Sequence, residues 1–395
     1  MRFKNYFKTK FLIYSFLFVC FHCQAAGSDT LLSFKTVYGS GDSIKIMVEG
    51  SNLQFEGIEN LVVGDEGWYK LTSNTVTIRG DLSTLRCLQC GITEINLSQA
   101  KTLKQLVCSG NYIKSIDASK CPELERLFCN SNELTYLNVD GCRQLVTLFC
   151  FQNRLRQLSV NTNENLTTLS CTENKISEID LSANKKIEDL YFGDNLLRSL
   201  NVSENVDLKT LWCNDNQLKA INLTNNENLR KLYCQRNEIT ELNLSNNKKV
   251  NKIYCFLNRI GEGKMQELME SLPVLPDYSK GSIYVVDASE EKEKNVCTKA
   301  HVAIGVSHNW KIYDYNQGIA KEYEGATTSI NETLSDVQCF QLTNHGIVTT
   351  APVGVSLYGT DGKLVFDGIV DGELLLGKGF YVGIIGKQKV KFGIK

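Results

Sequence analysis

Apolar residues recur through the middle of this 395-residue chain with a period of 21 residues. Such a period indicates stacked repeats, each of which supplies one short strand to a parallel sheet and buries its apolar side chains against its neighbours. Because a unit of this length has no room for a full helix, we expect the segment that returns from one strand to the next to be extended or 3₁₀. In two consecutive units the apolar positions are Ile113, Ile116, Ala118 and Leu124, then Leu134, Leu137, Val139 and Leu145.

One cysteine and one asparagine mark almost every unit of the repeat. Leucine, or Ile253 in the last unit, stands two residues before the cysteine, and asparagine stands three residues after it. The pattern Leu-x-x-Leu-x-Cys-x-x-Asn-x-Leu is that of a leucine-rich repeat with cysteine at one leucine position, and Phe192 replaces the cysteine once. We expect the asparagine side chains to hydrogen-bond turn backbone inside the coil. The cysteines are Cys87, Cys108, Cys129, Cys150, Cys171, Cys213, Cys234 and Cys255, and the asparagines are Asn111, Asn132, Asn153, Asn174, Asn195, Asn216, Asn237 and Asn258.

The repeated cysteines are interpreted as small buried apolar residues that form a structural ladder. Neighbours in such a ladder are about 4.8 Å apart, whereas metal ligands must converge on one point. We therefore predict neither a metal site nor redox chemistry along the ladder. Cys121 and Cys142 occupy a second column, in which later units carry asparagine. Their spacing allows either a disulfide bond or two buried free thiols.

The residue between leucine and cysteine in each unit is predicted to point outward, on the concave face of the sheet. Six of the nine residues at this position are aromatic, where a solvent-facing position normally carries a polar residue. Exposed aromatic patches often mark binding surfaces, although stacking between the rings would by itself also rigidify the sheet. We predict a partner-binding surface made of Phe128, Phe149, Phe151, Tyr191, Trp212, Tyr233 and Tyr254, with polar contacts from Arg126, Lys231 and Lys252.

The segments outside the repeats divide the chain into further parts. Residues 1–10 are basic and lack acids, an apolar run follows at 11–21, and small residues stand at 25–27, which predicts a signal peptide over residues 1–25. An uncleaved anchor and a lipidated Cys23 are the alternatives, and no later stretch is long enough to span a membrane. We assign residues 26–80 to an N-terminal β cap, 81–260 to leucine-rich repeats, 261–317 to an α/β C-terminal cap, 318–333 to a linker and 334–395 to a β-sandwich domain.

The C-terminal third changes from the repeat to mixed patterns. Apolar spacing over 264–272 predicts a helix, followed by a strand at 281–287, a helix at 290–308 and a strand at 309–315. Tyr284, Trp310 and Tyr313 either continue the aromatic surface or fill this cap. Beyond the linker, two Asp-Gly pairs beside alternating runs predict hairpins. The predicted fold is thus an α/β-type leucine-rich repeat solenoid with a parallel β sheet, few helices and a small C-terminal all-β sandwich.

Composition argues against several classes of function. Lys and Arg number 43 against 44 Asp and Glu, a net charge of -1, so the chain has no basic excess to hold nucleic acid. The 4 histidines and the lack of a nucleophile–base signature, phosphate loop or zinc motif predict no enzyme activity, no catalytic residue, no metal and no cofactor. His301 and His308 are interpreted as packing or solvated residues of the cap helix.

The repeats resemble those of internalin-J-like leucine-rich repeat surface proteins of Bacteroidetes. The likeness covers about residues 70–316 and includes Thr75-Val-Thr-Ile-Arg-Gly80 and the stretch from Glu293 to Tyr313. The final segment, with Val355-Ser-Leu-Tyr358 and Lys378-Gly-Phe-Tyr-Val382, resembles a type IX secretion C-terminal sorting domain. These resemblances imply export to the cell surface or medium of a Gram-negative bacterium, with the export machinery contacting the C-terminal domain.

Two binding hypotheses follow, and a purely structural role in a surface layer is a further alternative. In the first, the chain is a secreted or surface-attached adhesin whose aromatic face binds a host or bacterial surface protein. In the second, the same aromatic residues stack on sugar rings and bind a carbohydrate. The fold itself hosts many functions, so the sequence does not name the ligand.

Overall fold

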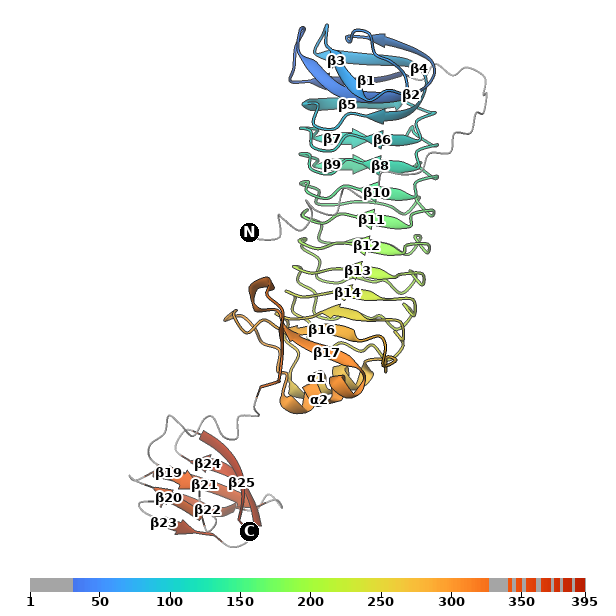
Figure 1. The fold of residues 1–395 in the computed structure, drawn as a ribbon. Helices are drawn as coiled ribbons and strands as arrows, with labels where there is room; N and C mark the ends of the chain where they lie inside the picture. The colour runs from blue at the N-terminus through green and yellow to red at the C-terminus, as the bar shows by residue number, and fades with distance from the viewer. Residues whose placement is uncertain are drawn as a thin grey trace.

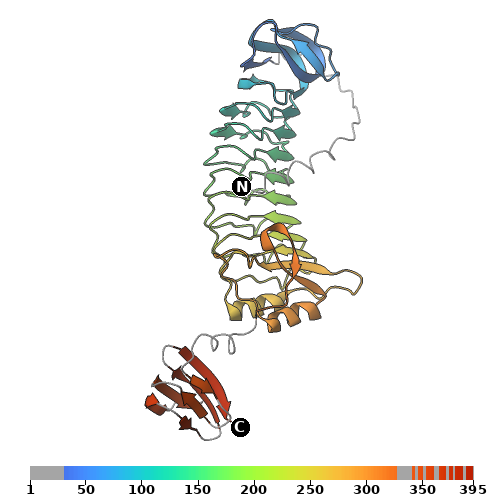
Figure 2. The same ribbon diagram turned by 60° about the vertical axis from the view of Figure 1, so that its left-hand side comes forward.

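The computed structural model describes residues 31–326 and, beyond them, 340–342, 346–349, 353–359, 364–370, 373–376, 379–385 and 388–394. The predicted signal peptide and Cys23 lie outside these residues. Figure 1 shows a long coil of stacked turns, with antiparallel strands closing one end and the helices α1 and α2 at the other. In Figure 2 the strands of successive turns lie on one side of the coil and the returning segments on the opposite side.

A sheet of 16 strands runs the length of this coil. Its repeat strands pair in parallel and in register, so that Leu169, Leu190 and Leu211 lie side by side. No helix interrupts residues 81–260, all of which are described, so the predicted solenoid of 21-residue units is confirmed. These strands are β4 (Thr75–Arg86), β6 (Gln105–Val107), β8 (Arg126–Phe128), β10 (Thr147–Phe149), β11 (Thr168–Ser170), β12 (Asp189–Tyr191), β13 (Thr210–Trp212), β14 (Lys231–Tyr233) and β15 (Lys252–Tyr254).

The predicted asparagine column forms a hydrogen-bond ladder inside the coil. The Oδ1 atom of Asn195 accepts a hydrogen bond from the Ile176 backbone N–H at 3.0 Å, and its Nδ2 atom donates to the carbonyls of Cys171 at 2.9 Å and Gly193 at 3.1 Å. One side chain thereby satisfies backbone groups from two turns that would otherwise be buried without a partner. The column of leucine and cysteine side chains beside it is fully buried.

A second asparagine column stabilises the opposite corner of each turn. Asn184 is buried and its Nδ2 atom donates to the carbonyls of Val160 and Asn163, both at 2.9 Å. Cys121 and Cys142 occupy this column in earlier turns and are buried free thiols. The structure therefore contains the free-thiol alternative of the two that their spacing allows. On the returning side, β7 (Ser115–Asp117) and β9 (Tyr136–Asn138) form a small parallel pair.

The N-terminal end of the coil is closed by antiparallel strands, namely β1 (Leu31–Thr36), β2 (Ser43–Glu56), β3 (Gly67–Lys70) and β5 (Ile92–Gln99). Strand β4 pairs antiparallel with β1 and β2 and, at Thr84 to Arg86, parallel with β6. The predicted boundary between residues 80 and 81 therefore falls inside one continuous strand. Gly80 allows this strand to pass close to β2, because its φ is +108° and a Cβ atom there would lie 2.4 Å from the Asn52 carbonyl oxygen.

The C-terminal cap extends the parallel sheet with two strands backed by helices. Its elements are α1 (Glu262–Ser271), β16 (Gly281–Val286), α2 (Lys299–Ser307) and β17 (Trp310–Asp314). The helix predicted over 290–308 is shorter, because the Glu293 carboxylate holds the preceding segment as a turn. It accepts hydrogen bonds from the backbone N–H groups of Leu257 at 2.8 Å, Asp287 at 2.7 Å and Asn295 at 2.9 Å. Glu293 thus ties the cap to the last repeat.

Part of the predicted linker is ordered against the cap, which corrects the prediction for residues 318–326. After η2 (Asn316–Gly318), the strand β18 (Lys321–Glu322) pairs antiparallel with β17. The Tyr323 hydroxyl donates to the Cys297 carbonyl at 3.1 Å, and the Ala326 N–H donates to the same carbonyl at 2.9 Å. Most residues of this stretch are small or polar, which predicted a linker, whereas the edge of β17 supplies backbone partners for β18.

The described C-terminal strands form two antiparallel sheets, one of β19, β20 and β23 and the other of β22, β21, β24 and β25. Buried Ile347 comes from the first sheet and buried Leu357 from the second. This small all-β region agrees with the predicted fold class. Its strands are β19 (Phe340–Leu342), β20 (Gly346–Thr349), β21 (Val353–Gly359), β22 (Leu364–Val370), β23 (Glu373–Leu375), β24 (Gly379–Ile385) and β25 (Gln388–Ile394).

Candidate functional site

The outward positions of the parallel strands carry a column of rings, which we call the aromatic stripe. In-register pairing places each ring beside the next, because Tyr191 pairs with Trp212 and Trp212 with Tyr233. Ring centroids are 5.3 Å apart for Tyr191 and Trp212, and 4.6 Å apart for Trp212 and Tyr233. All these rings are half-buried. The stripe consists of Phe128, Phe149, Tyr191, Trp212, Tyr233, Tyr254, Tyr284 and Tyr313.

The stripe continues from the repeats into the C-terminal cap. Tyr284 of β16 and Tyr313 of β17 stack with ring centroids 4.9 Å apart. Trp310 does not join the stripe but fills the cap. It is buried there, and its Nε1 atom donates to the Pro273 carbonyl at 2.9 Å. Tyr315 was not anticipated: its ring stacks on Phe256 at 4.3 Å. Phe256 was visible in the sequence as a residue that follows a ladder cysteine.

Ser170 separates the stripe into two groups of rings. On one side, Phe128 and Phe149 meet edge to face at 5.2 Å. Phe151 is buried and its centroid is 6.2 Å from that of Phe149, so it supports the stripe from the neighbouring column. On the other side of Ser170 the rings are tyrosine or tryptophan. The predicted residues are therefore brought together, with Phe151 as a buried support.

Basic side chains border the stripe on the side where the strands begin. Arg126 and Lys231 are exposed and Lys252 is half-buried. The Nζ atom of Lys252 lies 5.5 Å from the centroid of the Tyr254 ring, a cation–π distance. Each predicted polar contact residue thus lies at the edge of the aromatic stripe.

An acidic column borders the stripe on the other side, where the strands end, and we call Glu173, Asp194 and Asp215 the acid ladder. These residues occupy one position in three successive turns, with φ between +52° and +56°. Asp194 is exposed at the surface, but partial desolvation by its neighbours, followed by the carboxylates of Asp215 and Glu173, raises its pKa to about 6. Burial also raises the pKa of Asp215, although the Asn214 amide and Arg236 oppose that shift.

A row of amide and hydroxyl side chains lies between the stripe and the acid ladder. We call Thr172, Asn214 and Gln235 the acceptor row; all three are buried. Within the described part of the chain, Thr172 Oγ1, Asn214 Oδ1 and Gln235 Oε1 have no hydrogen-bond partner. These residues follow the ladder position in their turns, and the sequence pattern alone does not show that their side chains are buried.

The remaining candidate chemistry is structural. Burial raises the pKa of the Cys108 and Cys234 thiols to about 12, which keeps them protonated and poorly reactive. His301 is buried at the start of α2, where its Nδ1 atom accepts a hydrogen bond from the Thr298 N–H at 3.1 Å. Among the described residues, no group of three or more His, Cys, Asp or Glu side chains is placed to hold a metal ion. In the same residues no helix has the length and apolarity to cross a bilayer.

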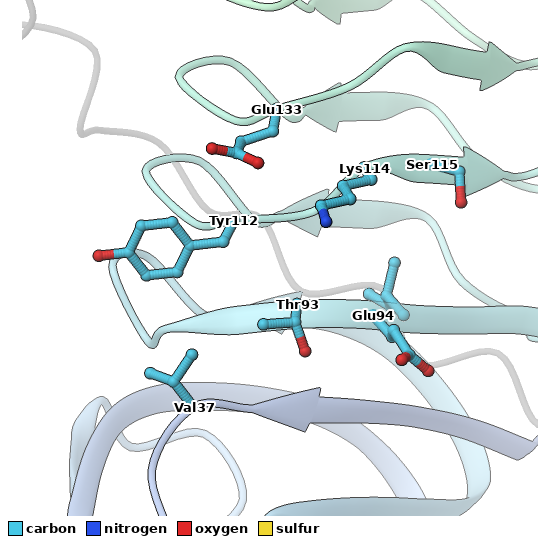
Figure 3. A pocket seen from close by; sticks show the side chains of 8 residues that line it. Val37, Thr93, Glu94, Tyr112, Lys114, Ser115 and Glu133 are labelled. Carbon is cyan, nitrogen blue, oxygen red and sulfur yellow. The ribbon is translucent and has the colours of Figure 1, made fainter.

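A separate hollow of about 560 Å³ opens between the N-terminal cap and the first repeats, on the side of β5 and β7 (Figure 3). Its acidic groups are already paired, since Glu94 lies 2.7 Å from Lys35 and Glu133 lies 3.0 Å from Arg154. The hollow is lined by Val37, Thr93, Glu94, Ile95, Tyr112, Lys114, Ser115 and Glu133. These residues offer no cluster of unpaired chemical groups comparable with the acceptor row.

Comparison with solved structures finds leucine-rich repeat proteins. The functional domain of InlJ from Listeria monocytogenes, described as including a cysteine ladder, is 18% identical, with 82% of this chain and 94% of that chain covered and a TM-score of 0.34. The internalin InlF of the same species is 15% identical, with 58% and 79% covered and a TM-score of 0.40. A leucine-rich repeat protein of Leptospira interrogans is 15% identical, with 54% and 61% covered and a TM-score of 0.40. No protein-family model and no curated protein matches the chain.

Proposed function

We propose that this chain is a secreted or cell-surface binding protein, an adhesin that contacts a protein partner through the aromatic stripe. The observation that carries the proposal is the unbroken row of rings from Tyr191 to Tyr313 on the outer face of the sheet. A solvent-facing sheet position normally carries polar residues, and tyrosine and tryptophan are the residues that most often anchor protein interfaces. Export is supported by the basic and apolar pattern of residues 1–25 and by the resemblance of the C-terminal segment to a sorting domain.

The stacking geometry favours a protein over a carbohydrate as the partner. Tyr254 and Tyr284 lie 4.0 Å apart with an interplanar angle of 8°, and Tyr233 and Tyr254 lie 4.8 Å apart at 16°. Rings stacked in this way cover one another's faces and direct their edges outward. A sugar stacks on the face of a ring, whereas a protein surface also packs against ring edges and bonds to hydroxyl groups.

The experiment compares two variants of the purified protein in attachment to bacterial and host cells. Tyr191→Ser, Trp212→Ser and Tyr233→Ser together remove the centre of the stripe and should reduce attachment at least tenfold. The matched control, Tyr112→Ser, Tyr136→Ser and Tyr278→Ser, removes three exposed rings elsewhere and should retain attachment. Circular dichroism verifies that both variants fold, and Tyr233→Ser alone provides a milder test.

Treatment of the cells separates the two classes of partner. Protease treatment should abolish attachment of the unmodified protein, while glycosidase treatment should leave it intact. The opposite result would favour the carbohydrate alternative. Full attachment by the folded triple stripe variant would contradict the proposal, whichever class the partner belongs to.

A further inference from the structure

We propose that lysines beside the aromatic stripe bind an acidic segment of the protein partner. These lysines are Lys231, Lys252 and Lys311, which we call the lysine column. The inference rests on the proposed function, because it names the chemistry that the partner brings to the same face of the sheet. It commits to aspartate or glutamate side chains of a protein, and an anionic polysaccharide is one outcome of the test.

The lysine column arises from a motif that recurs in the last strands of the parallel sheet. Strands β14, β15 and β17 contain Lys-Leu-Tyr, Lys-Ile-Tyr and Lys-Ile-Tyr, and β16 contains Ser-Ile-Tyr. The middle residue of each motif is buried in the core, so the lysine or serine shares the outward face with the tyrosine. In-register pairing places Lys231 beside Lys252, and Ser282 between Lys252 and Lys311. A row of cations thus runs alongside the row of rings.

The protein itself supplies little negative charge to the lysine column. From β13 to β17, all of which are described, this outward position carries no acidic residue. Lys231 is exposed and has no ion-pair partner in the part of the chain that the structure describes. Lys311 lies 3.5 Å from Glu322, but both side chains are exposed, and such surface pairs contribute little. Lys231 and Lys252, on strands about 4.8 Å apart, repel each other, and an anionic ligand would relieve that repulsion.

The aromatic stripe supplies the second observation, because it adds apolar edges and further donors to the same face. Residues two apart in a strand are separated by about 6.6 Å, so each lysine reaches the ring of its own strand. The Nζ atom of Lys252 does so, 5.5 Å from the Tyr254 centroid. An ammonium carries only donors and a tyrosine hydroxyl can donate, whereas an ionised carboxylate only accepts. The face therefore matches a segment in which acidic side chains stand among apolar ones.

The acid ladder determines on which side of the stripe an acidic segment can lie. Glu173, Asp194 and Asp215 border the stripe where the strands end, and they repel carboxylates. Arg236 does not reverse this charge, because it lies 4.0 Å from Asp215 and 3.5 Å from Glu290 and is shared between them. The sheet face is thus negative on one side of the stripe and positive on the other. An acidic segment is held over the lysine column, along the axis of the solenoid.

A protein segment fits this surface better than other polyanions do. Nucleic acid requires a broad basic surface, whereas the whole chain has 43 Lys and Arg against 44 Asp and Glu. A sulfated polysaccharide would stack its sugars on ring faces, but Tyr254 and Tyr284 cover each other's faces at 4.0 Å. Ring edges and ammonium groups remain, and these are contacts that protein side chains make.

The experiment measures binding of short peptides to the full chain by fluorescence anisotropy at low salt. The probe is a labelled peptide that repeats Glu-Gly-Phe three times, and its matched control repeats Gln-Gly-Phe. Both peptides offer the same rings and differ only in charge. We expect the glutamate peptide to bind at least tenfold more tightly than the glutamine peptide, and its affinity to fall as salt is raised. Labelled dextran sulfate is the polysaccharide probe.

Two pairs of substitutions locate the site on the protein. Lys231→Gln with Lys252→Gln should weaken binding of the glutamate peptide at least tenfold, and Lys231→Arg with Lys252→Arg should restore it. The control, Lys175→Gln with Lys219→Gln, removes two exposed lysines of the returning segments and should bind as the unmodified protein does. Circular dichroism verifies folding. The urea midpoint of the glutamine variant should be unchanged or higher, because two neighbouring like charges are removed.

Three results would overturn the inference. They are equal affinity for the two peptides, unchanged affinity of the folded Lys231→Gln and Lys252→Gln variant, and lysine-dependent binding of dextran sulfate without binding of the glutamate peptide. The cell-attachment assay keeps the inference separate from the proposed function. If the triple stripe variant loses attachment while the variant with both lysines replaced retains it, the stripe binds the partner without the lysine column. If the folded stripe variant retains attachment, the proposed function itself fails.

Discussion

Tyr254 and Tyr284 stack with their ring centroids 4.0 Å apart although the 21-residue period ends between them. Tyr254 ends the last repeat strand and Tyr284 belongs to the first strand of the cap, which pairs in parallel and in register with it. The outward position of the sheet is therefore aromatic both in the last repeat and in the first strand of the cap, although the sequence pattern changes between them. This contact joins the stripe of the repeats to that of the cap and gives the first prediction.

Tyr254→Ala should lower the free energy of unfolding by about 2 kcal/mol. The ring stacks on both Tyr233 and Tyr284, and such aromatic pairs contribute about 0.5–1.5 kcal/mol each beyond area burial. Urea denaturation checks the value, with Tyr278→Ala as the control, since Tyr278 is 92% exposed and its loss should change stability by less than about 0.5 kcal/mol. Equal stability of the two variants would show that the rings do not support one another.

Asn195→Ala should destabilise the protein more strongly, by about 3 kcal/mol. The substitution removes one acceptor and three donor contacts to buried backbone, and the orphaned groups retain their desolvation penalty. Asn225→Ala is the matched control, because Asn225 is exposed and makes a single hydrogen bond to the Ser203 carbonyl at 3.1 Å. Denaturant unfolding should show a small loss for the control and a large one for Asn195→Ala.

The repeats could be predicted from the sequence because one spacing fixes several columns at once. A period of 21 aligns the cysteines, the asparagines and the outward rings together, and parallel pairing in register then places each ring on the next. The C-terminal cap could be predicted less completely from the sequence. The turn before α2 is held by the Glu293 carboxylate, which accepts a hydrogen bond from the backbone of Leu257, 36 residues away, and no local pattern contains such a contact.

The acid ladder could be predicted from the sequence only in part. Glu173, Asp194 and Asp215 align at one offset of the repeat, so their column could be found by counting. Their side-chain direction could not, because these residues have positive φ, where the alternation of a strand no longer applies. Similarly, the composition of residues 318–326 predicts a linker, whereas β18 within them forms a strand that pairs with β17.

Phe192→Cys restores the cysteine ladder between Cys171 and Cys213 and should nevertheless lower stability by about 2–3 kcal/mol. Phe192 is fully buried, and replacing a ring by a thiol leaves a cavity that a close-packed core fills only in part. Calorimetry or urea unfolding measures the loss, and Cys213→Ala, which removes one sulfur atom, should cost less. A neutral or stabilising Phe192→Cys would show that the turn relaxes around the smaller side chain.

Asp194→Asn should stabilise the protein near pH 7.5 and leave it almost unchanged near pH 4. The folded-state pKa of Asp194 is raised to about 6 by partial desolvation and by Asp215 and Glu173, with Arg236 opposing the shift, while an unfolded aspartate has a pKa of about 3.9. Between these values the folded state binds more protons, so the contribution of Asp194 to stability is present below about pH 4 and is lost as the pH rises through about 6. Asparagine does not titrate, so the difference in Tm between Asp194→Asn and the unmodified protein should grow from pH 4 to pH 7.5. The control is Asp207→Asn, at an exposed position, whose difference in Tm from the unmodified protein should stay nearly constant with pH. If the difference in Tm for Asp194→Asn is also constant, the carboxylates of the acid ladder do not raise the pKa of Asp194.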